Sequence, residues 1–102
     1  MKIYDKLVRD KIPMIIESTN KKCEVEVVSD KVALEYLYKK LNEEVDELLQ
    51  DKNLDEIADV MEVLFAIGDK YGYSEEDVLH KRNNKKSARG GFENNLILKK
   101  TW

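Results

Sequence analysis

Two stretches with a helical pattern of apolar residues, separated by only three polar residues, constrain the fold of this chain most strongly. The first stretch runs from about residue 31 to residue 50, the second from about residue 54 to residue 71, and DKN at residues 51–53 connects them. A connection this short makes two consecutive helices antiparallel neighbours. The sequence therefore predicts a helical hairpin whose two facing sides lie close together.

Shorter elements are predicted around this hairpin. A short helix is expected at residues 13–18, where proline suits the first turn. A third long helix is expected to begin after Ser74, which is followed by three acids, and to run to residue 89 before two glycines. The alternation of CEVEVV at residues 23–28 predicts a strand, and residues 92–102 are expected to return beside it.

Length and charge narrow the class of protein. A chain of 102 residues fits a single domain over residues 1–102, which we expect to be mainly α with a small two-stranded β appendage. The net charge of −3 provides no general positive field for nucleic acid. No apolar run approaches the roughly 20 residues of a membrane helix, and the first residues lack the apolar core of a signal peptide. A cytoplasmic protein without nucleic-acid or membrane partners is expected.

Acidic residues lie unusually close to the apolar sides of the two hairpin helices. With about 100° per residue, the apolar stripe of the first helix comprises Leu34, Leu37, Tyr38, Leu41, Val45 and Leu48. The main stripe of the second helix comprises Leu54, Ile57, Met61 and Leu64, and Val60, Val63 and Ile67 widen it on one side. Glu44 falls at the edge of the first stripe, and Glu56 projects into the widened sector. An ionised carboxylate beside apolar groups is costly unless another group compensates it.

Four of these acids form two pairs with i, i+3 spacing, Glu44 with Glu47 and Glu56 with Asp59. Each pair presents its carboxylates on one side of its helix. Across an antiparallel hairpin the two pairs would face each other and repel unless a cation lay between them. Oxygen ligands of this kind suit Mg²⁺ or Mn²⁺. The alternative interpretation is a solvated acidic face paired with Lys39, Lys40 and Lys52. We accept it for Glu43, Asp46 and Asp55, but it fails for Glu56.

Basic residues gather in one sector of the third long helix, namely Arg82, Lys85, Lys86 and Arg89. Ammonium and guanidinium groups on one face can hold phosphate groups. Alternatively, basic residues in a last turn complement the helix dipole without any ligand. Arg9 and Lys11 are further candidates for phosphate binding, or they pair with acids at the helix ends.

The segments KLNEEVDELL and EIADVMEVL resemble the EExxE…ExxD signature of the MazG-like nucleoside triphosphate pyrophosphohydrolases. Phosphoribosyl-ATP pyrophosphohydrolase and the dimeric dUTPases belong to the same all-α superfamily. The opening YDKLVRDKIPMII and the late RGGF resemble a small single-domain branch of it, so the resemblance spans nearly the whole chain.

This resemblance implies an antiparallel helical bundle of the all-α NTP pyrophosphatase type that assembles as a homo-oligomer. It implies that Mg²⁺ is bound by Glu44, Glu47, Glu56 and Asp59, and that a nucleotide is hydrolysed between its α and β phosphates. The products would be a monophosphate and pyrophosphate, in a housecleaning role for the nucleotide pool. Contacts of the third long helix with phosphate are also implied.

The chemistry of this reaction requires a water nucleophile and neutralised phosphate oxygens, both of which a bound metal ion supplies. Glu47 is the candidate for accepting the proton of the water. Two other functions stay open. The first is a non-catalytic helical interaction module with the same fold, which intact paired acids disfavour. The second is a nucleic-acid binder that uses the basic helix, which the net charge disfavours.

Overall fold

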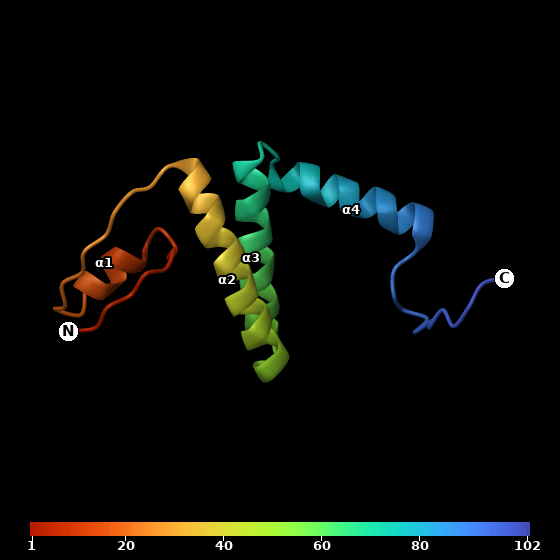
Figure 1. The fold of residues 1–102 in the computed structure, drawn as a ribbon, viewed down its shortest axis with the longest axis horizontal. Helices are drawn as coiled ribbons and strands as arrows, with labels where there is room; N and C mark the ends of the chain where they lie inside the picture. The colour runs from red at the N-terminus through yellow and green to blue at the C-terminus, as the bar shows by residue number, and fades with distance from the viewer.

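The computed structural model describes residues 1–102 and contains four helices and no strand (Figure 1). The helices are α1 (Ile12–Glu17), α2 (Asp30–Asp51), α3 (Leu54–Lys70) and α4 (Glu75–Arg89). The prediction of a mainly α chain is confirmed, and each predicted helix is present with ends that differ by at most one residue. None of the four helices combines the length and the apolarity that crossing a membrane requires.

The predicted hairpin is formed by α2 and α3, which lie side by side in Figure 1. The chain reverses at Lys52, which adopts the left-handed conformation with φ of 53° and ends α2. Asn53 then caps α3, because its side-chain oxygen accepts a hydrogen bond of 3.0 Å from the backbone N–H of Glu56. The left-handed backbone of Lys52 and the side-chain cap of Asn53 thus set the antiparallel arrangement.

The core of the hairpin is small and lies on the valine side of α3. Leu37 of α2 packs with Val63 and Ile67 of α3, and all three are buried. Partly buried side chains pack around them, namely Leu7, Leu34, Leu41 and Ala66. The main stripe predicted on this helix instead remains open to solvent. Its members, Leu54, Ile57, Met61 and Leu64, are between 47% and 78% exposed, and we call them the exposed α3 stripe.

The prediction of a two-stranded appendage is wrong. Residues 23–28 have no regular secondary structure, and residues 92–102 do not lie beside them (Figure 1). Figure 1 shows the reason: α4 points away from the hairpin and carries the C-terminal segment to the opposite end of the molecule from the N-terminal segment. A strand is stabilised by hydrogen bonds to a neighbour. Because its expected neighbour is remote, the CEVEVV segment has no partner.

The single chain is extended. Its radius of gyration is 17.9 Å, whereas a compact domain of this length has about 13 Å. Ser74 and Asp77 form the predicted cap of α4, with bonds of 2.9 and 3.1 Å in both directions. Beyond this cap, α4 touches only α3 and has no buried residue. One chain therefore forms a hairpin, and α4 does not pack along it as a third helix of a bundle.

Candidate metal centre

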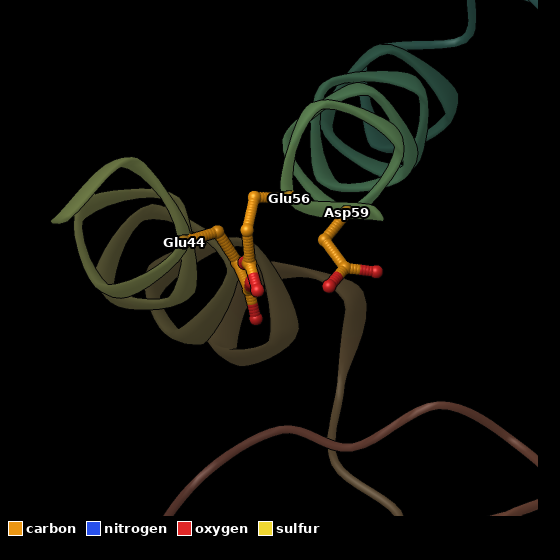
Figure 2. A group of neighbouring side chains, drawn as sticks. All are labelled: Glu44, Glu56 and Asp59. Atoms are coloured by element: carbon orange, nitrogen blue, oxygen red, sulfur yellow. The ribbon is translucent and has the colours of Figure 1, made fainter. Parts of the chain in front are cut away.

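Three carboxylates converge between the two helices of the hairpin. Glu44 of α2 and Glu56 and Asp59 of α3 each offer one oxygen, and these oxygens all lie within 4.8 Å of one another. Figure 2 shows the three side chains pointing into the space between α2 and α3. We call them the carboxylate cluster. The i, i+3 spacing of Glu56 and Asp59 places both on one side of α3, and the tight connection brings Glu44 opposite them.

The cluster contains buried carboxylate oxygens without hydrogen-bond partners. Glu44 is only 7% exposed, and one of its oxygens lies 3.5 Å from Nζ of Lys40. Its second oxygen, Oε2, and Oε2 of Glu56 are both buried and accept no hydrogen bond. Leaving a buried acceptor unsatisfied costs about 1–3 kcal/mol, and more for a charged group. A divalent cation would satisfy both oxygens, and carboxylate oxygens are the ligands that Mg²⁺ and Mn²⁺ prefer.

The pKa values of two members reflect this crowding. Burial raises the pKa of Glu44, and the charge of Glu47 raises it further, while the charge of Lys40 acts in the opposite direction. Burial also raises the pKa of Glu56, and the charge of Asp59 raises it further. Both shifts mean that the ionised form of the cluster is unfavourable in the folded chain when no cation compensates it.

Glu47, the remaining acid of the predicted set, lies beside the cluster. It interacts with both Glu44 and Glu56, since it contributes to the pKa of each. Its oxygens do not belong to the set that lies within 4.8 Å. The structure thus brings together three of the four predicted ligands closely and places the fourth at their side.

Two cations contact the cluster. Lys40 approaches Glu44, as described above, and its side chain is 18% exposed. Arg9, in the segment before α1, places Nη2 2.9 Å from Oδ1 of Asp59. Arg9 was among the residues predicted to bind phosphate, whereas Lys40 was expected only to pair with solvated acids. The i, i+4 spacing of Lys40 and Glu44 on α2 is the signal that would have identified it.

A cleft of about 340 Å³ opens beside the cluster, between α2, α3 and residues 7–10. Glu44, Asp59, Arg9 and Lys40 all line it, together with the apolar side chains of the core. The cleft therefore combines acidic groups for a cation with basic groups for an anion, and both face the same space.

The basic residues of α4 lie elsewhere. Arg82, Lys85, Lys86 and Arg89 are exposed and line no part of this cleft. α4 meets α3 near Gly68, in the last turns of α3, where an added Cβ would lie 3.3 Å from Val78. The carboxylate cluster lies in the first turns of α3. Lys86 instead forms an ion pair of 3.7 Å with Glu93.

The acids that sequence analysis assigned to solvated faces, Glu43, Asp46 and Asp55, take part in neither the cluster nor the cleft. The carboxylate cluster and the cleft are thus the features on which a functional assignment can rest. Comparison of the chain with models of protein families, with curated proteins and with solved structures gives no match.

Proposed function

We propose that this protein is a Mg²⁺-dependent nucleotide pyrophosphohydrolase of the MazG-like type, with Mn²⁺ able to replace Mg²⁺. The observation that carries the proposal is the pair of buried oxygens without hydrogen-bond partners on Glu44 and Glu56. Both residues match acids of the EExxE…ExxD signature that the chain resembles. A solvated acidic face does not bury carboxylate oxygens without partners, whereas a cation site uses such oxygens as ligands. The substrate is a nucleoside triphosphate or a related nucleotide, and the role is the housecleaning of the nucleotide pool.

In this proposal Glu44, Glu56 and Asp59 hold the metal ion, with Glu47 at their side. When bound, Mg²⁺ supplies positive charge to the phosphate oxygens and lowers the pKa of a water molecule. Because Glu47 lies outside the closely spaced oxygens, its carboxylate is free to accept the proton of the attacking water. The water oxygen bonds to the α-phosphorus, the bond from this phosphorus to the α–β bridging oxygen breaks, and pyrophosphate leaves with the electron pair.

Assembly as a homo-oligomer belongs to the same proposal. The exposed α3 stripe is a row of large apolar side chains from Leu54 to Leu64, and only 6 of the 102 residues are buried in the single chain. Contiguous apolar surface of this kind marks an interaction site in soluble proteins. A second copy laid on the stripe would cover it, and two hairpins together would form an antiparallel helical bundle.

The same assembly gives the basic residues of α4 a role. Within one chain α4 leads away from the carboxylate cluster, so its cations reach the site only from another copy. We assign phosphate binding to Lys85 and Arg89, with Lys86 and Arg82 beside them, on the α4 of the neighbouring copy.

The test is the release of pyrophosphate from a panel of standard and modified NTPs and dNTPs, with Mg²⁺ and with EDTA. We expect release that requires the metal and is lost in Glu56→Gln. The control is Glu35→Gln, the same substitution at an exposed position of α2, which is expected to keep the activity.

Two negative results have different meanings. Binding of Mg²⁺ without release from any nucleotide would refute the proposed reaction on these substrates while leaving the metal centre in place. Absence of Mg²⁺ binding would refute the metal centre itself. The non-catalytic helical interaction module would then be the better assignment, and the exposed α3 stripe would be its binding surface.

A further inference from the structure

Arg9 contacts the carboxylate cluster through Asp59. Its Nη2 donates to Oδ1 of Asp59 at 2.9 Å, and Asp59 is also a member of the carboxylate cluster. The Arg9 side chain is 54% exposed. An ion pair this open to solvent contributes little to stability, typically between 0 and 1 kcal/mol. Stabilisation of the fold therefore gives no sufficient reason for a guanidinium at this position.

The backbone on both sides of Arg9 is held in place. On one side, Leu7 packs against the buried residues of the hairpin, and Asp5 accepts a hydrogen bond of 2.7 Å from the hydroxyl of Tyr36. On the other side, the N–H of Ile12 donates to the carbonyl oxygen of Arg9 at 3.0 Å, at the start of α1. Arg9 is thus presented at the mouth of the cleft by an anchored segment, while its long side chain can turn.

Charge decides what the side chain does when the cleft is filled. When Glu44, Glu47, Glu56 and Asp59 are all ionised, they carry four negative charges, and ion pairs with Arg9 and Lys40 compensate two of these. One divalent ion carries the charge that is missing. Once Asp59 binds such an ion, the attraction between Asp59 and Arg9 falls. The guanidinium of Arg9 is then left beside the metal centre with free N–H groups.

A phosphate group is the natural second partner of that guanidinium. Its planar array of donors matches two phosphate oxygens at once, and it stays charged at every physiological pH. Lys40 is less suited to this change of partner, because it is more buried and lies on the same helix as Glu44. The cations of α4 are remote within the chain, whereas Arg9 already lines the cleft.

We propose that Arg9 changes partner during binding: it pairs with Asp59 while no divalent ion is bound, and it holds a phosphate group of the substrate once the ion has taken Asp59. This inference rests on the proposed function, because it requires the metal centre. It adds a phosphate-binding residue from the chain's own N-terminal segment, and it makes metal and phosphate binding depend on each other.

Two binding measurements test the exchange without catalysis. Mn²⁺ is titrated alone by calorimetry, and inorganic triphosphate is then titrated in the presence of saturating Mn²⁺. In Arg9→Ala, Mn²⁺ alone is expected to bind about two- to fivefold more tightly, because a competing cation has been removed. Triphosphate is expected to bind roughly tenfold to a hundredfold more weakly, the loss typical of a charge-assisted contact.

Two further variants make the result specific to Arg9. Lys6→Ala removes one positive charge from the same segment at an exposed position, so it is expected to change both affinities less than twofold. Arg9→Lys keeps the charge but loses the planar pair of donors, and we expect an intermediate loss of triphosphate affinity. Thermal melting shows whether each variant is folded.

The outcomes separate this inference from the proposed function. If wild type binds Mn²⁺ and triphosphate and Arg9→Ala changes neither affinity, the exchange is refuted and the metal centre stands. If Arg9→Ala weakens Mn²⁺ binding, Arg9 supports the cluster structurally and does not compete with the ion, which also refutes the exchange. If wild type binds no Mn²⁺, the proposed function and this inference fail together.

Discussion

Replacing Glu44 with glutamine is expected to stabilise the metal-free protein, although it alters one of its few buried side chains. The carboxylate is 7% exposed, one of its oxygens has no partner, and its neighbours include Glu47 and Asp59. Lys40 favours the ionised form, yet the pKa of Glu44 is raised on balance, because burial and the acidic neighbours outweigh Lys40. Because the ionised form of Glu44 is unfavourable on balance, replacing it with a neutral glutamine is expected to stabilise the folded chain.

The magnitude follows from the unsatisfied oxygen. A glutamine keeps an oxygen that can accept from Lys40, and its new N–H groups can donate to an adjacent carboxylate. Relief of one buried unsatisfied group is worth about 1–3 kcal/mol in the free energy of unfolding. For a domain near this size, each kcal/mol shifts the melting temperature by about 4–8 °C. Glu44→Gln is thus expected to melt at least about 4 °C above wild type in EDTA.

Mg²⁺ is expected to make wild type more stable than Glu44→Gln. A ligand at a hundred times its dissociation constant stabilises the folded state by about 2.7 kcal/mol. Wild type should gain this stabilisation, and Glu44→Gln should gain little because it has lost a ligand. The assay is thermal or urea unfolding of both proteins with EDTA and with Mg²⁺, and Glu35→Gln on the exposed face of α2 is the matched control. The reasoning is refuted if Glu44→Gln is less stable than wild type in EDTA, since the Lys40 pair would then dominate.

Two further predictions concern pH and assembly. Because the pKa of Glu44 is raised above its ordinary 4.5, the folded chain binds protons more tightly than the unfolded chain, and its stability relative to Glu44→Gln rises as pH falls through the raised pKa. Urea unfolding in EDTA should therefore show the difference between the two proteins at pH 7 and nearly none below pH 4.5; a constant difference would contradict the burial argument. Met61→Lys, in the exposed α3 stripe, is expected to convert the proposed homo-oligomer to monomer in sedimentation experiments, whereas Leu98→Lys, in the exposed C-terminal segment, is expected to leave the sedimenting mass unchanged. If both variants dissociate, or if neither does, the exposed α3 stripe is not the interface.

The hairpin and the three members of the carboxylate cluster could be predicted from sequence because both depend on short-range geometry. Helical spacing placed Glu56 and Asp59 on one side of α3, and the short connection fixed the partner helix. A local pattern also located the cap at Ser74, where the side-chain chemistry acts within three residues.

The features that sequence missed depend on choices between distant parts of the chain. Both apolar sectors of α3 could form the core, and the structure buries Val63 while leaving Leu64 exposed. The CEVEVV alternation predicts a strand only if a second strand reaches it, and the direction of α4 prevents this. The contact of Arg9 with Asp59 joins residues 50 positions apart and has no local signature.

The most direct measurement of the central claim is the position of a metal ion. Crystals grown with Mn²⁺ and measured at an anomalous wavelength are predicted to show a strong peak among the oxygens of Glu44, Glu56 and Asp59, at about 2.0–2.2 Å from them. Such a peak would establish the carboxylate cluster as a divalent metal centre. No peak there, with Arg9 still paired with Asp59 at saturating Mn²⁺, would contradict both the metal centre and the hydrolysis that depends on it.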